Sequence, residues 1–173
     1  MAQIREVVDT NDKQRFTITS LETPDGPKDF IRANQGHSIK TIQVEMTPIT
    51  SAKEYPTIVH GTNAKAWALI AKDKNGLSRM KRNHIHFATG LIGEEGVISG
   101  MRYSCTHFIY IDLNKALKDG IKFFKSENAV VLTEGVKGEG YLPKEYFSKV
   151  VMRNGEVLWP LKTDEKKKEN AKS

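Results

Sequence analysis

The chain of 173 residues lacks several features that would assign it to a common class of protein. It has a single cysteine, Cys105, so it can form neither an internal disulfide nor a cysteine-rich zinc site. It has no apolar run near the roughly 20 residues that a transmembrane helix needs. Its first 16 residues also lack the apolar core of a secretory signal. We therefore expect an intracellular protein, in the cytoplasm or the nucleus, that has no membrane partner.

Three short motifs of common enzymes are absent as well. The sequence contains neither GxGxxG nor GxxxxGK[ST], which form the two common phosphate-binding loops. It also lacks the GxSxG motif of the serine hydrolases. Two histidines, His84 and His86, fall on one face of an expected strand, but no acidic or sulfur residue is adjacent to them. Together with His60 they favour a nucleotide site over a metal site, and a purely structural pair is the alternative.

The charge of the chain is uneven. The net charge is +6, and residues 49–110 hold eight basic and four acidic residues, with the densest clusters at 72–74 and 79–82. A local basic patch suits a partner that carries phosphate. The alternative is a solvated surface that is rich in lysine. Hydrophobic residues make up 38% of the chain, which is enough for a folded core.

The pattern of short strands and short helices predicts an α+β fold. In the first third of the chain we expect the end of a helix at 4–10, a hairpin of strands 14–20 and 28–34, and a connector at 45–55. A short strand at 58–59 leads into a turn at His60, and Asn63 begins a helix over 64–74 that buries Leu69. The remaining expected elements are strands at 84–88, 108–112, 121–125, 129–133 and 149–152, a helix at 114–118, and a type I′ hairpin through 154–155.

Two further clusters combine an arginine with residues that suit a phosphate or a sugar. The first contains Arg32, Asn34, Gln35 and His37 at the end of the expected hairpin, and a guanidinium group can bind two phosphate oxygens in one plane. A polar loop with a glycine turn is the alternative. The second is the glycine-framed segment 96–104, which carries Arg102 and Ser104. Should the two arginines converge, they would form a clamp for a transferring phosphate. Cys105 is expected to be a packed residue and not a nucleophile.

The motifs, taken in order, resemble those of the NAD-dependent RNA 2′-phosphotransferases of tRNA splicing. The resemblance covers about residues 5–151. It rests on these stretches: NDKQRF at 11–16, RANQGHSI at 32–39, HGT at 60–62, GLSRMKRNHIHFA at 76–88, GVISGMR at 96–102, IYIDLNKAL at 109–117, FFKSENAVVLTEG at 123–135 and YLPKEYF at 141–147.

The resemblance implies two lobes. Residues 1–48 would be the remnant, hairpin or wing, of a winged-helix-like lobe for RNA and phosphate. Residues 49–161 would form an ADP-ribosyltransferase-like lobe that binds NAD, and residues 162–173 a disordered charged tail. The family's first lobe also has an Arg-His pair in an LRH-type motif, which is not found before Asn11. We therefore expect a truncated first lobe and an impaired second step.

The resemblance also implies a reaction. An internal 2′-phosphate of ligated RNA, expected to be tRNA, attacks the nicotinamide ribose of NAD, and a ribose hydroxyl then attacks the phosphorus. The products are nicotinamide, RNA with a 2′-hydroxyl and ADP-ribose 1″,2″-cyclic phosphate, with NAD as co-substrate and no metal. We expect the protein to be a monomer.

The family motifs assign roles to residues of this chain. Arg32 and Arg102 would grip the phosphate. The NAD-binding residues would be His60, Gly61, Thr62, Gly76, His84 and His86. The residues on the RNA or phosphate side would be Asn34, Gln35, His37, Arg82 and Ser104. A non-catalytic module that binds NAD or RNA phosphate is the alternative. A protein ADP-ribosyltransferase is disfavoured, because residues 128–131 lack the glutamate of those enzymes.

Overall fold

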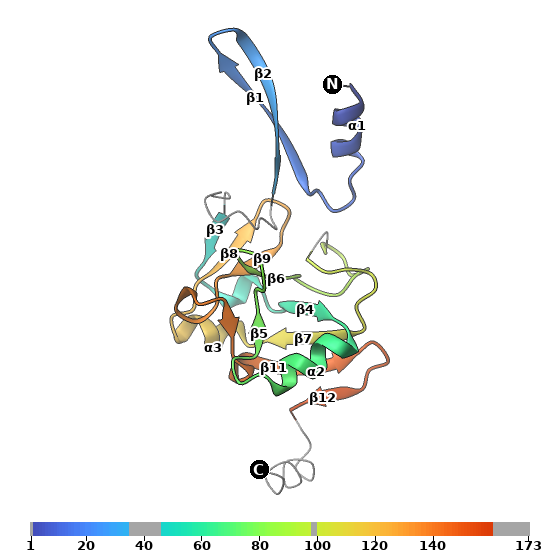
Figure 1. The fold of residues 1–173 in the computed structure, drawn as a ribbon, viewed down its shortest axis with the longest axis vertical. Helices are drawn as coiled ribbons and strands as arrows, with labels where there is room; N and C mark the ends of the chain where they lie inside the picture. Colours follow the sequence, from blue (N-terminus) through green and yellow to red (C-terminus); the bar gives the residue numbers. More distant parts are fainter. Residues whose placement is uncertain (1, 35–45, 98–99, 161–173) are drawn as a thin grey trace, which may run out of the picture.

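The computed structural model describes residues 2–34, 46–97 and 100–160. Short helices and antiparallel strands make up the described fold, which agrees with the expected α+β class. Helix α1 (Ala2–Asp9) and the hairpin of β1 (Phe16–Thr23) and β2 (Gly26–Ala33) project from the main body, as Figure 1 shows. A helix and a hairpin thus lie close to the positions expected from the sequence. Gln35 and His37 lie outside the described residues, as does the charged tail.

Two four-stranded antiparallel sheets form the main body. The first sheet has the order β12-β11-β7-β4, with bounds Val157–Trp159, Phe147–Met152, His107–Ile111 and Val59–Thr62. The second has the order β3-β8-β9-β6, with bounds Met46–Ile49, Phe123–Ser126, Val131–Thr133 and Ile85–Phe87. A short pair joins β5 (Leu77–Ser78) to β10 (Tyr141–Leu142).

Backbone hydrogen bonds join the two sheets where β4 runs beside the end of β6. The backbone groups of Val59 and Ala88 exchange two hydrogen bonds of 2.9 Å, and both residues are fully buried. Beyond this bridge β4 continues in the first sheet and β6 in the second. We call the point at which β4 and β6 diverge the fork. Side chains of both sheets can reach the space between the two strands there.

Two helices form part of the connections that follow strands β4 and β7. Helix α2 (Ala64–Lys72) follows β4 and begins where the side chain of Asn63 accepts a hydrogen bond from Ala66 N. Helix α3 (Leu113–Lys118) follows β7 and is capped in the same way by Asp112. Three 3₁₀ turns complete the described elements, at Ala52–Glu54, Val136–Gly138 and Lys144–Tyr146. No helix within the described ranges is both long and apolar enough to cross a membrane.

Four local expectations were wrong. The expected connector at 45–55 contains β3, which pairs with β8; Pro48 is accommodated because β3 is an edge strand. His60 lies within β4 and not in a turn. Leu69 is 67% exposed, since it borders a cavity. The β11–β12 turn is not type I′, because Gly155 has a positive φ and Asn154 does not.

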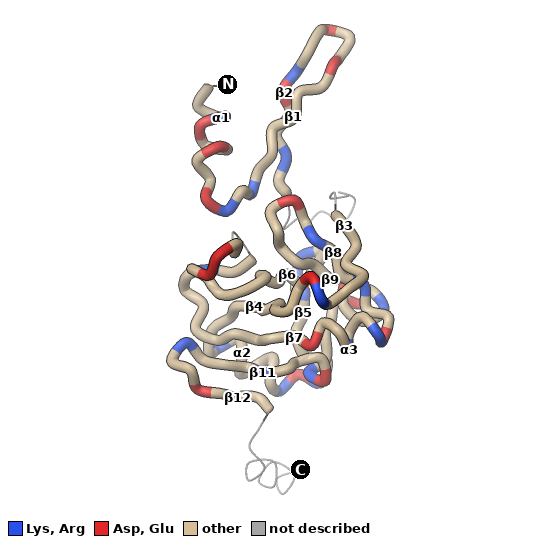
Figure 2. Tube along the Cα trace, turned by 180° about the vertical axis from the view of Figure 1, so that it is seen from behind, with Lys and Arg blue, Asp and Glu red and all other residues tan. Residues whose placement is uncertain are grey.

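The distribution of charge along the chain does not amount to one basic face. In the view of Figure 2, acidic and basic positions are interspersed along the described part of the trace. The local arrangement of cations at a cavity is therefore more informative than the net charge of +6.

Gly135 provides a test of the packing beneath the β5–β10 pair. Its φ is +83°, and an added Cβ would lie 2.2 Å from the backbone oxygen of Tyr141. Gly120 has a similar φ of +82° with no atom within 4 Å of the added Cβ. We expect Gly120→Ala to lower the free energy of unfolding by about 1–2 kcal/mol, the cost of the left-handed backbone alone. Gly135→Ala should cost about 2–5 kcal/mol, because overpacking adds to that cost. Urea unfolding measures both, and equal losses would contradict the described contact.

Candidate functional site

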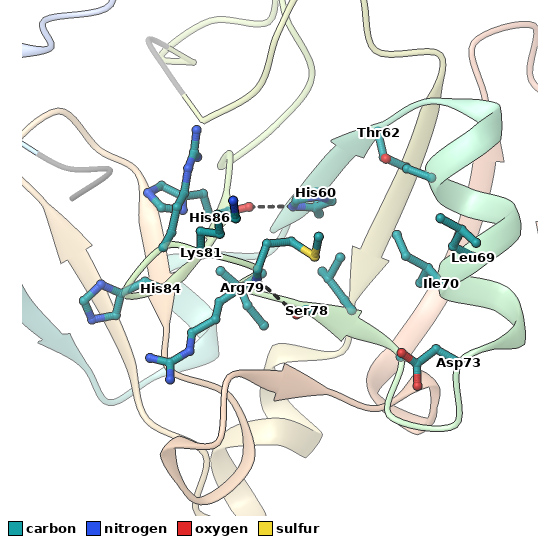
Figure 3. Close-up of a pocket in the computed structure, with 16 residues that line it drawn as sticks. His60, Thr62, Leu69, Ile70, Asp73, Ser78, Arg79, Lys81, His84 and His86 are labelled. Atoms are coloured by element: carbon teal, nitrogen blue, oxygen red, sulfur yellow. Dashed lines mark hydrogen bonds between the residues drawn. The ribbon is translucent and has the colours of Figure 1, made fainter. Parts of the chain in front are cut away.

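A cavity of about 570 Å³ opens at the fork between the two sheets. Its volume falls within the range of about 300–1,000 Å³ that is usual for small-molecule sites. Strands β4 and β6, helix α2 and the segment from β5 to β6 contribute its wall, as Figure 3 shows. The lining residues are His60, Thr62, Ala66, Leu69, Ile70, Asp73, Gly76, Leu77, Ser78, Arg79, Met80, Lys81, Arg82, His84, Ile85 and His86.

A hydrogen bond between the two strands of the fork fixes the orientation of His60. Its Nδ1 lies 2.8 Å from the backbone oxygen of His86 (Figure 3). A carbonyl oxygen can only accept, so Nδ1 carries the proton. Burial lowers the pKa of His60, although the hydrogen bond to His86 acts in the opposite direction. A neutral ring with a proton on Nδ1 presents Nε2 as an acceptor.

His86 is buried on β6, and its Nε2 has no hydrogen-bond partner within the described structure. Burial lowers the pKa of His86 to about 3, and the positive charge of Arg82 acts in the same direction. The ring is therefore neutral at pH 7. Buried polar atoms are almost always paired in folded proteins. His86 lines the cavity, but its Nε2 is itself enclosed by protein, so a ligand can pair with this atom only if the wall adjusts.

The segment between β5 and β6 places cations at the cavity. Arg79 donates from Nη1 to the backbone oxygen of Asn83 at 3.2 Å, and Arg82 N donates to Arg79 O at 3.2 Å. Met80 has a φ of +56° and is 80% exposed at the cavity wall. Non-glycine residues adopt this conformation rarely and often at functional sites. Arg79, Lys81 and Arg82 of this segment all border the cavity, where their positive charges suit an anionic ligand.

The remaining residues expected to bind NAD occupy different positions. Thr62, Gly76 and His84 line the cavity, and Nε2 of His84 lies 3.9 Å from Glu134 Oε1. Gly61 does not line it. An added Cβ on Gly61 would lie 2.9 Å from Cys105 Sγ, so glycine is required there for packing. Among the described residues, no group of three or more His, Cys, Asp or Glu is placed to hold a metal ion.

The arginine of the hairpin is held by the turn between β8 and β9. Arg32 Nη2 lies 2.5 Å from Glu127 Oε1, and the Thr17 hydroxyl lies 2.9 Å from Glu127 Oε2. Asn34 is buried and donates from Nδ2 to Gln14 O at 2.8 Å, which closes the base of the hairpin. Arg32 and Asn34 thus lie where the hairpin meets the second sheet, away from the lining of the fork cavity.

The second arginine lies in a turn before β7. Arg102 O accepts from Cys105 N at 3.1 Å, and Arg102, Tyr103 and Ser104 are exposed. Cys105 is buried, as expected of a packed residue. Arg32 and Arg102 therefore lie on different elements. Lys13, described next, contacts both the turn that pairs with Arg32 and the segment that carries Arg102.

Lys13 is a residue that sequence reasoning missed, although it belongs to the NDKQRF stretch. It is 9% exposed and donates from Nζ to Met101 O at 2.8 Å, with the Tyr103 ring 4.7 Å away. The Lys13 backbone oxygen accepts from Asn128 Nδ2 at 3.1 Å. Lys13 lines a second cavity of about 220 Å³, together with Ile92, Gly93, Glu94, Val97, Met101 and Tyr103.

The low pKa of His86 predicts a loss of stability in acid. The unfolded chain takes up a proton below about pH 6.5, whereas the folded chain takes it up only near pH 3, so stability falls as pH falls through this window. Between pH 7.5 and pH 5 we expect a loss of about 1–2 kcal/mol from this residue. Urea unfolding at both pH values measures it. The variant His86→Asn should show a smaller loss, and an equal loss would contradict the assignment.

Comparison with known proteins identifies relatives that match most of the chain. A Schizosaccharomyces pombe protein is 53% identical over 96% of this chain, which corresponds to 43% of its own length. The tRNA 2′-phosphotransferase 1 of Mus musculus is 47% identical over 86% of this chain and 58% of its own length. The tRNA 2′-phosphotransferase of Saccharomyces cerevisiae is 38% identical over 94% of this chain and 66% of its own length. The chain thus spans about two fifths to two thirds of the length of these relatives.

The sequence profile of the RNA 2′-phosphotransferase, Tpt1 / KptA family matches residues 1–135. The match includes the whole fork cavity, the hairpin arginine and the turn of Arg102. The chain therefore belongs to the RNA 2′-phosphotransferase, Tpt1 / KptA family.

Proposed function

We propose that this chain carries the NAD-binding part of an RNA 2′-phosphotransferase, which transfers an internal 2′-phosphate of RNA, in particular tRNA, to NAD. The observation that carries the proposal is the fork cavity, where two neutral histidines face a space bordered by cations. Family membership and the names of the relatives supply the substrate class. We further propose that residues 49–161 are an ADP-ribosyltransferase-like lobe and residues 1–48 part of a winged-helix-like lobe.

The residues of the cavity fit a dinucleotide. The acceptor Nε2 of His60 suits the amide and hydroxyl groups that such a ligand offers. The Thr62 hydroxyl can join it. Arg79, Lys81 and Arg82 border the same space and suit its diphosphate. The apolar side chains of Leu69 and Ile70 on α2 offer a surface for a ring.

NAD supplies a glycosidic bond to a good leaving group, and the protein has to bring a weak nucleophile close to it. In this proposal the arginines hold the RNA phosphate and stabilise the charge on its oxygens. Arg32 is already paired with Glu127, so an incoming phosphate must displace or share that carboxylate. The exposed Arg102 needs no such exchange with a described carboxylate, and the buried ammonium group of Lys13 lies beside the same turn.

The direct test is to incubate the chain with NAD and an RNA that carries a single 2′-phosphate labelled with ³²P. Transfer of the label from RNA to a small molecule, with release of nicotinamide, is the expected result. Nicotinamide release without loss of the RNA label would mean that only the first step occurs. RNA and NAD binding with neither product would contradict the enzymatic function and support a non-catalytic binding module.

Replacement of Arg102 distinguishes turnover from binding. We expect Arg102→Ala to lower the turnover of phosphorylated RNA by about 10²–10³-fold, because one charge-stabilising donor is lost. RNA affinity, measured by fluorescence anisotropy, should change much less. Lys149→Ala is the control, since Lys149 contacts the Tyr110 ring on the first sheet and not the turn of Arg102. An affinity loss as large as the turnover loss would assign Arg102 to binding alone.

A further inference from the structure

Arg153 is the second residue of the four-residue turn Met152–Gly155 between β11 and β12. Gly155 N donates to Met152 O at 2.9 Å, and Met152 N donates to Glu156 O at 2.7 Å, with Gly155 at a φ of +90°. This is a type I turn followed by a glycine bulge. The turn fixes the backbone of Arg153 at the end of the hairpin. Arg153 lies beyond the residues 1–135 that the family profile matches.

The guanidinium group of Arg153 holds the turn that carries Arg102. Arg153 Nη2 donates to the backbone oxygens of Tyr103 and Cys105, each at 2.6 Å. The nitrogen has two N–H groups, one for each carbonyl. In addition, Arg153 N donates to Thr106 O at 2.8 Å. One residue of the β11–β12 hairpin thus binds three carbonyl groups of the segment 103–106.

The longer stretch 101–106, which includes Arg102, is anchored from two other directions. Thr106 N donates to Thr62 O at 2.8 Å, which ties it to the end of β4 beside the fork cavity. Lys13 Nζ donates to Met101 O at 2.8 Å and ties the segment to the N-terminal part of the chain. Arg102 lies between these anchors and is exposed. Its side chain can therefore reach a ligand only from the position that the anchors give to its backbone.

We propose that Arg153 is a positioning residue, which holds the 102–105 turn so that Arg102 meets the RNA phosphate. The proposal rests on the proposed function, because it assigns Arg102 to the phosphate. A displacement of about 1 Å at a reacting group can cost as much as about 10²-fold in rate. The two short bonds from a charged donor to neighbouring carbonyls are the contacts that prevent such a displacement.

A double-mutant cycle tests whether Arg153 acts through Arg102. Arg153→Met keeps the side-chain stem and removes the donors, and should lower kcat for phosphorylated RNA about 10- to 100-fold. The KM for NAD should change less than about threefold, because Arg153 does not line the fork cavity. In the Arg102→Ala background the same change should have little further effect. Arg153→Lys should recover part of the lost rate.

The reactivity of the Cys105 thiol measures how firmly the 102–105 turn is held, and this measurement does not require enzymatic turnover. Cys105 is the single cysteine of the chain and is buried, and its backbone oxygen is one of the acceptors of Arg153. We expect Arg153→Met to accelerate the reaction of this thiol with Ellman's reagent several-fold under native conditions. Lys149→Met is the matched control, because it removes a cation from β11 that does not contact the turn.

The outcomes separate the two proposals. A wild-type chain that binds NAD and RNA but yields no product contradicts the proposed function, and with it the role of Arg153. An active wild type with an equally active Arg153→Met variant contradicts only the role of Arg153. The role of Arg153 is also contradicted if Arg153→Met lowers the rate equally in the wild type and in the Arg102→Ala variant. Such additive losses would indicate a general loss of stability that does not act through Arg102.

Discussion

The candidate site depends on the hydrogen bond from His60 to the backbone oxygen of His86. This bond forms where β4 and β6 diverge into two different sheets. Val59 and Ala88 join β4 to β6 at the point of divergence. One residue further along β4, the His60 ring bridges the gap to β6. This bond fixes the tautomer of His60 and holds its ring against the backbone of β6, beside the cavity that His60 and His86 both line.

The second constraint is the segment that leads from Met101 to β7. Gly61 allows Cys105 to pack directly against β4, so the segment lies behind the strand that carries His60 and Thr62. Lys13 binds its first part, and Arg153 binds its last part. The nucleotide cavity and the proposed phosphate group Arg102 are thereby parts of one connected structure. A shift of the segment would move both relative to each other.

The hairpin contributes the second arginine by a different connection. Glu127, in the turn between β8 and β9, pairs with Arg32, while its neighbour Asn128 donates to the backbone of Lys13. The same turn therefore holds both the hairpin and the segment that precedes it. Because the Arg32 pair is partly exposed to solvent, its contribution to stability is small, about 0–1 kcal/mol. A phosphate can compete for Arg32 at little cost to the fold.

Local sequence determined the helix at Asn63, the β1–β2 hairpin and the family motifs, because capping, turn and alternation signals act over a few residues. Strand alternation and the family resemblance predicted that His60, His84 and His86 contribute to one site, and all three line the fork cavity. Only the tertiary structure decided that β3 pairs at a sheet edge, that Leu69 borders a cavity, and that His86 Nε2 is left without a partner. The same holds for Lys13 and Arg153, whose partners lie 88 and 48 to 50 residues away. Contacts of this range depend on how the sheets pack, and no local pattern encodes them.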